Sequence, residues 1–196
     1  MSDAEVLQYK PRLGNLSVSE KINEAEMLKA QGNIYVKSGD YNGALSKYAM
    51  VFAYVNGLFT KSDSMAMYSS KSEAALLCGQ DEAQKIQLLK QAVWSNMALC
   101  YLKTDKPAKA IEVCDKILSL DCLHSKALFR KSQALAHMHH YDRAKAILRQ
   151  LVEKEPSNSI VRKEYVAVSQ FEKKVQKEEN SKSSFANIFN KNSCSM

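Results

Sequence analysis

Residues 91–103 read QAVWSNMALCYLK, and residues 125–137, which begin 34 positions later, read SKALFRKSQALAH. The two stretches share an order of small and large residues rather than identities. The correspondence continues downstream, and its matching pairs are Ala98 with Ser132, Tyr101 with Leu135, Ala110 with Ala144, and Leu118 with Val152. Self-similarity with this period is typical of a solenoid of helix–turn–helix units. We therefore expect stacked helix pairs, whose inner face forms a groove that can bind a ligand.

A third copy of the pattern lies upstream, in residues 25–58. Its small residues are Gly32 and Ala44, at the positions of Ala98 and Ala110 in the second copy. Each copy also has a short polar turn between its two helices, at Gly39-Asp40, Asp105-Lys106 and His139-His140. Small residues are needed where two helices cross closely, and large ones fill the space on either side. Three copies in register make the pattern specific.

The pattern resembles the tetratricopeptide repeat (TPR), in which two antiparallel helices meet through small residues. The resemblance implies an all-α fold, with three helix–turn–helix pairs in a right-handed solenoid and a C-terminal capping helix. Within a TPR domain over 17–179, we expect repeats at about 25–58, 91–124 and 125–158, and the capping helix at 159–179.

Three segments lie outside the repeats. We expect residues 1–16 to be irregular and residues 180–196 to form a flexible tail, because both are rich in residues that disfavour packed structure. Ser17 and Glu20 have capping-box spacing, which predicts that the first helix starts there. Residues 59–90 interrupt the repeat: the part from Glu82 is expected to be helical, and the rest a surface loop.

The composition of the chain limits the classes of protein to which it can belong. The chain of 196 residues has only three prolines and six glycines, which favours helices, and it has no apolar run long enough to span a membrane. The N-terminus has no signal-peptide pattern, and the five cysteines are an odd number without C-x-x-C spacing. We therefore expect free thiols and a cytoplasmic protein. The net charge of +7 is compatible with a nucleic acid, an anionic membrane or an acidic peptide as partner.

Five polar residues are expected on the concave wall, because the first helix of each repeat faces that side. They are Lys29, Asn33, Asn96, Lys126 and Arg130. These positions match a subset of TPR proteins in which two lysines, two asparagines and an arginine form a dicarboxylate clamp. The clamp holds the C-terminal Glu-Glu-Val-Asp of heat-shock protein 90 or 70, and charge-assisted hydrogen bonds to its carboxylates suit such residues. The resemblance therefore implies a peptide-carboxylate site made by these five side chains.

Further stretches resemble the TPR region of the large immunophilins, which are prolyl isomerases, and the small stand-alone TPR co-chaperones. The stretches are Gln91 to Lys103, Lys126 to Lys131 (KALFRK) and Phe185 to Phe189 (FANIF). An immunophilin carries its isomerase domain upstream, but only about twenty residues precede the first helix here, too few for such a domain. We expect a non-enzymatic, monomeric co-chaperone adaptor without a cofactor.

Several alternatives stay open at this point. The chain could be a TPR scaffold that binds another partner through its convex face or the 60–80 loop, or an immunophilin-like protein lacking the catalytic domain. Binding to nucleic acid or membrane is disfavoured, because residues 161–182 mix both signs of charge. The four histidines (His124, His137, His139 and His140) lack a ligand spacing, so no metal is expected. The sequence does not choose between heat-shock proteins 90 and 70.

Overall fold

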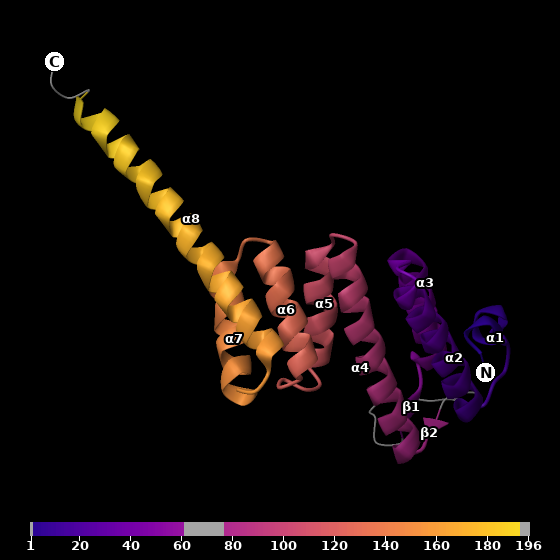
Figure 1. Ribbon diagram of the computed structural model, residues 1–196. Helices are drawn as coiled ribbons and strands as arrows, with labels where there is room; N and C mark the ends of the chain where they lie inside the picture. Colours follow the sequence, from indigo (N-terminus) through magenta and orange to yellow (C-terminus); the bar gives the residue numbers. More distant parts are fainter. Residues whose placement is uncertain (1, 61–76, 193–196) are drawn as a thin grey trace. The chain divides into compact units, whose positions relative to one another are not determined.

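The computed structural model describes residues 2–60 and 77–192 of the chain (Figure 1). They divide into two compact units, residues 1–122 and 123–196. The first unit contains α1 (Asp3–Gln8), α2 (Val18–Lys37), α3 (Tyr41–Val55), β1 (Phe59–Thr60), β2 (Leu77–Cys78), α4 (Gln80–Lys103) and α5 (Pro107–Leu118). The second contains α6 (Ser125–His137), α7 (Tyr141–Lys154) and α8 (Ser159–Asn192). The all-α expectation is confirmed, with one short strand pair added.

The helices form pairs, α2 with α3, α4 with α5 and α6 with α7, where the sequence copies predict them (Figure 1). The small residues at the crossing points are buried: Gly32, Ala98 and Ser132 on the first helices, and Ala44, Ala110 and Ala144 on the second. None of the described helices has the length and hydropathy required to cross a membrane. The repeat pattern therefore corresponds to helix pairs that touch through small side chains.

The three turns inside the pairs share one geometry. Each has a residue in the left-handed region: Gly39 at φ 83°, Asp105 at φ 56° and His139 at φ 62°. The next N–H in each turn donates to the carbonyl five residues earlier, at 2.9 Å in all three cases. This is the Schellman arrangement that ends a helix. His139 and His140 are therefore part of the turn that ends α6. Within the described residues, no group of His, Cys, Asp or Glu side chains is arranged to hold a metal ion.

The two helices of the first pair approach each other closely at Gly32. A Cβ added at Gly32 would lie 2.4 Å from Cε1 of Tyr48, a distance that real contacts do not reach. Tyr48 is fully buried, and the corresponding positions of the other copies hold the smaller Cys114 and Leu148, also fully buried. Gly32 therefore makes room for an aromatic ring at a position where the other two pairs have a smaller side chain.

The N-terminal segment differs from the irregular extension expected over 1–16. It contains α1, which begins with a capping box between Ser2 and Glu5. The expectation followed Pro11, Gly14 and Asn15 and overlooked that Ser2 and Glu5 have the same spacing as Ser17 and Glu20. That second capping box is confirmed at the start of α2.

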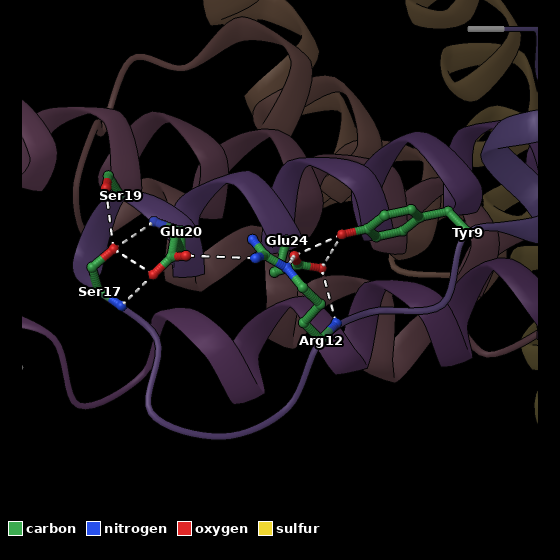
Figure 2. Close-up of polar contacts among 6 residues, drawn as sticks. All are labelled: Tyr9, Arg12, Ser17, Ser19, Glu20 and Glu24. Atoms are coloured by element: carbon green, nitrogen blue, oxygen red, sulfur yellow. Dashed lines mark hydrogen bonds and ion pairs between the residues drawn. The ribbon is translucent and has the colours of Figure 1, made fainter.

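The segment after α1 is fastened to α2 by a buried carboxylate, Glu24, which is only 1% exposed (Figure 2). The Tyr9 hydroxyl donates to its two oxygens at 2.6 and 2.8 Å, and Arg12 donates from Nε at 2.8 Å and from its backbone N–H at 3.2 Å. Two turns further along the same face of α2, the Gln31 amide donates to the carbonyls of Val6 and Tyr9 at 2.8 and 2.7 Å. We call residues 2–16 the N-terminal strap.

Two further expectations need correction. The capping helix begins at Ser159 as expected, but α8 continues to Asn192, through most of the segment predicted to be a flexible tail. Extending an existing helix costs far less than starting one, so weak helix formers can still continue it. In the insertion, α4 begins at Gln80 rather than Glu82, and β1 pairs in parallel with β2. The loop expected between them falls mostly on residues 61–76, outside the described part.

In the second unit α8 covers α7. Val161 and Val168 of the predicted apolar stripe are buried, and Tyr165 and Val175 are half-buried. Outside the stripe, the Lys145 ammonium lies 2.5 Å from the Glu172 carboxylate, and the rings of Tyr141 and Phe171 stack with centroids 6.1 Å apart. The first part of α8 therefore acts as the predicted cover for the last helix pair.

The Gly32–Tyr48 crossing predicts the effect of adding one methyl group. Gly32→Ala should lower the free energy of unfolding by about 1–3 kcal/mol, because the ring must move in a packed interior. The loss should shrink in a Tyr48→Leu background, since the third pair already accommodates Ser132 opposite Leu148. Chemical denaturation of the four chains in this double-mutant cycle measures the coupling. Additive losses would show that the two side chains do not compete for space.

The strap predicts a pH dependence. Burial alone raises the pKa of Glu24, but hydrogen bonds from Tyr9 and Arg12 outweigh it and hold the pKa below its usual value. Its contribution is therefore complete above the unfolded-state pKa and is lost as the pH falls through the lower folded-state pKa. Glu24→Gln should cost about 1–3 kcal/mol at neutral pH and progressively less in acid.

Denaturation curves from neutral to acidic pH measure this difference. Glu26→Gln is the matched control, because Glu26 is exposed on the same helix and should change stability by less than about 0.5 kcal/mol. A constant gap between the Glu24→Gln variant and the unmodified chain at every pH would contradict the assignment.

Candidate functional site

The best-defined polar group on the first unit's predicted concave side is the Asn33 side chain on α2. Its Oδ1 accepts two hydrogen bonds, from the Tyr48 hydroxyl at 2.8 Å and from Nδ2 of Asn96 at 2.9 Å. Tyr48 comes from α3 and Asn96 from α4, so three helices fix one amide. Its oxygen is occupied by two donors, and its Nδ2 has no acceptor within the described residues, so the Nδ2 hydrogens can be offered to a ligand.

Lys29 lies one turn before Asn33 on α2, so both side chains leave the same face of the helix. Lys29 is half-buried, and no ion pair holds its ammonium group within the described part of the chain. Asn96 also retains its carbonyl oxygen and a second N–H beside the bond to Asn33. The first unit therefore groups one cation with two amides, as the sequence predicted for these three residues.

The other two predicted residues belong to the second unit. Lys126 and Arg130 lie one turn apart on α6, whose first turn is capped by His124: its Nδ1 accepts from the Ala127 N–H at 3.2 Å. Lys126 is exposed and Arg130 is half-buried. Ala127, between them in sequence, is fully buried and fixes which face of α6 is turned inward. The spacing places both cations on the same face of the helix.

Tyr48 is the residue whose role the sequence did not reveal. The repeat pattern assigned it to packing, and its ring is indeed fully buried. Its hydroxyl, however, orients Asn33, and this depends on the space left by Gly32. A tyrosine where the other copies have Cys114 and Leu148 was the only signal, and that difference alone does not specify a hydrogen bond.

The strap lies on a different face of α2. Glu24 and Gln31, which hold it, are seven residues apart and share one face, whereas Lys29 and Asn33 lie about 160° from Gln31 around the helix. Lys37, at the end of α2, adds an exposed ion pair to Asp3 of α1 at 3.7 Å. The strap therefore covers another side of α2 and leaves the Lys29–Asn33 face uncovered.

Comparison with known families identifies two of the copies. Models described as "Tetratricopeptide repeat" match residues 91–121 and 126–158. Among curated proteins, the chain is 29% identical over 175 residues to a bovine (Bos taurus) protein, peptidyl-prolyl cis-trans isomerase FKBP4. The match covers 89% of this chain but 34% of the relative, so the chain spans about a third of that relative's length.

Solved structures share the fold. The C-terminal TPR-containing domain of a Plasmodium falciparum FK506-binding protein matches with a TM-score of 0.65 at 22% identity, over 88% of this chain and 99% of that one. The first TPR of Spaghetti (RPAP3), bound to HSP90 peptide SRMEEVD, gives a TM-score of 0.53 at 23% identity. This match covers 74% of this chain and 90% of the RPAP3 chain. The second TPR domain of human RPAP3, in complex with HSP70 peptide SGPTIEEVD, gives a TM-score of 0.52 at 21% identity. This match covers 74% of this chain and 98% of the RPAP3 chain.

These matches agree with the helix pairs, the three identical turns and the small residues at the crossings. The chain contains tetratricopeptide repeats in a helical solenoid fold and is similar to the TPR region of FK506-binding immunophilins.

Proposed function

We propose that this chain is a non-enzymatic co-chaperone adaptor that binds the C-terminal Glu-Glu-Val-Asp of heat-shock protein 90 or 70. The observation that carries the proposal is the Asn33 amide, whose oxygen is occupied and whose N–H groups remain for an acceptor. A carboxylate accepts hydrogen bonds and donates none, so it matches what this amide can offer. The RPAP3 domains with the same fold are solved with peptides that both end in EEVD.

Three cations add charge to the two amides. Lys29 and Lys126 can each bind a carboxylate as a point charge, and Arg130 can bind one through two parallel N–H groups. Each charge-assisted bond is worth about 1.5–3 kcal/mol. We expect micromolar affinity, which corresponds to a binding free energy of about 8 kcal/mol. The proposed ligand-binding set is Lys29, Asn33, Asn96, Lys126 and Arg130.

The cellular setting is part of the same proposal. Cys78, Cys100, Cys114 and Cys122 form no disulfide within the described part of the chain, which suits a reducing compartment such as the cytoplasm. The region shared with the isomerase relative is the repeat region, and we propose that the chain itself binds as a monomer without catalysing prolyl isomerisation.

The test is a calorimetric titration of the full chain with SRMEEVD and SGPTIEEVD, each as the free acid and as the C-terminal amide. We expect micromolar binding of the free acids and at least tenfold weaker binding of the amides, because amidation removes one of the two terminal carboxylates. The tighter of the two free acids identifies the preferred chaperone. Equal binding of acid and amide would contradict the clamp.

Variants test the individual residues. Lys126→Ala, Arg130→Ala and Asn33→Ala should each weaken binding at least tenfold while leaving helicity unchanged, because each removes a direct ligand contact. Tyr48→Phe should weaken binding less, since it loosens Asn33 without removing it. Lys109→Ala is the matched control, because Lys109 is an exposed lysine on α5 outside the proposed set. Retained affinity in Lys126→Ala would point to another site.

A further inference from the structure

The side of α4 away from Asn96 carries a second concave feature. A pocket of about 400 Å³ lies within the first unit, formed by parts of α3, α4 and α5. Its lining comprises Ala49, Phe52, Asn56, Trp94, Met97, Tyr101, Lys109, Glu112, Val113 and Lys116. None of these residues belongs to the proposed carboxylate clamp. Trp94 and Asn96 are two positions apart on α4, which places them about 160° apart around the helix.

The floor of this pocket, which we call the aromatic pocket, is apolar. The rings of Phe52 and Trp94 stack with centroids 5.5 Å apart and an interplanar angle of 21°. Both rings are half-buried, whereas Met97 and Val113, which also line the pocket, are buried. A half-buried aromatic pair that lines a pocket favours a further ring, because stacked and edge-to-face pairs contribute beyond area burial. Methionine adapts to such a guest and contacts it favourably.

The rim of the aromatic pocket carries positive charge. Lys109 and Lys116 are exposed, lie two turns apart on α5, and form no ion pair within the described residues. Glu112 between them supplies one carboxylate against two ammonium groups. A ligand with acidic groups on both sides of an apolar centre would satisfy this rim, whereas a basic ligand would be repelled.

The spacing of the rim sets the spacing of the ligand. Seven residues of helix separate Lys109 from Lys116, a rise of about 10.5 Å. In an extended peptide, side chains two positions before and after a central residue are about 13 Å apart. The flexible lysine stems can accommodate the difference. The pocket is also near the lower end of the 300–1,000 Å³ range typical of small-ligand sites, which suits one inserted side chain rather than a helix.

We propose that the aromatic pocket binds an extended segment of a partner protein in which one aromatic side chain is flanked by acidic residues about two positions away on each side. The aromatic ring packs on Phe52 and Trp94, and the carboxylates pair with Lys109 and Lys116. This site is independent of a free C-terminus, so a partner could engage it at an internal segment.

The experiment uses Trp94, the single tryptophan of the chain, as the reporter. The probe is acetyl-Asp-Gly-Phe-Gly-Asp-amide, whose blocked ends remove any terminal carboxylate. We expect a saturable change in tryptophan fluorescence with a dissociation constant below about 1 mM. Replacing Phe by Ala, or both Asp by Lys, should weaken binding at least tenfold. No saturable response, or equal binding of the lysine peptide, would overturn the proposal.

Two variants locate the binding. Ala49→Arg fills the aromatic pocket while keeping the rim positive, and Lys109→Glu reverses one charge of the rim. Each substitution should weaken binding of the probe peptide at least tenfold. Ala53→Arg is the control, because Ala53 is exposed one turn further along α3 and does not line the pocket. Circular dichroism checks that all three fold. Unchanged probe affinity in the folded Ala49→Arg chain would overturn the assignment.

A comparison with the clamp separates the two proposals. Ala49→Arg and Lys109→Glu should leave the affinity for SRMEEVD and SGPTIEEVD unchanged. Lys126→Ala should leave the affinity for the blocked probe peptide unchanged. Saturating SRMEEVD should not displace the probe. Loss of the probe on adding SRMEEVD would place both ligands in one site and overturn the aromatic pocket as a separate site.

Discussion

The close approach of α2 and α3 at Gly32 is the contact on which the polar cluster of the first unit depends. The missing Cβ lets the Tyr48 ring lie against the α2 backbone, and the ring then reaches far enough for its hydroxyl to bond Asn33. Asn33 in turn accepts from Asn96, which ties α4 to the same point. Packing and the polar site are thus linked through one residue, because Tyr48 fills the space at Gly32 and its hydroxyl also orients the Asn33 amide.

Three surfaces of the first unit show how two helix pairs can serve several purposes. One face of α2 is covered by the N-terminal strap, whose polar groups converge on Glu24. Another face carries Lys29 and Asn33. The side of α4 away from Asn96 contributes the aromatic pocket, with Trp94 at its floor. In a solenoid each helix has a narrow packing stripe, so its remaining faces stay available for separate partners.

Most of the helices and turns could be predicted from the sequence, because the repeat pattern depends on residues that are close together in the chain. Small residues mark helix crossings, and Gly39, Asp105 and His139 mark equivalent turns; both signals depend only on neighbours in the chain. The helices α2, α3, α5, α6 and α7 therefore follow the pattern closely. The errors lie where the pattern is absent: α1, the far half of α8 and the β1–β2 pair belong to segments without a repeat to define them.

The repeat, the helix pairs and the spacing of the five polar residues proposed to bind a carboxylate end could all be predicted from the amino-acid sequence. Only the tertiary structure decided that Tyr48 orients Asn33, that Glu24 is buried under the strap, and that Phe52 and Trp94 share a pocket with lysines of α5. The physical reason is the range of the interactions. Helix periodicity is set by residues three or four apart, whereas these contacts join residues twelve or more apart, whose meeting depends on how the chain packs.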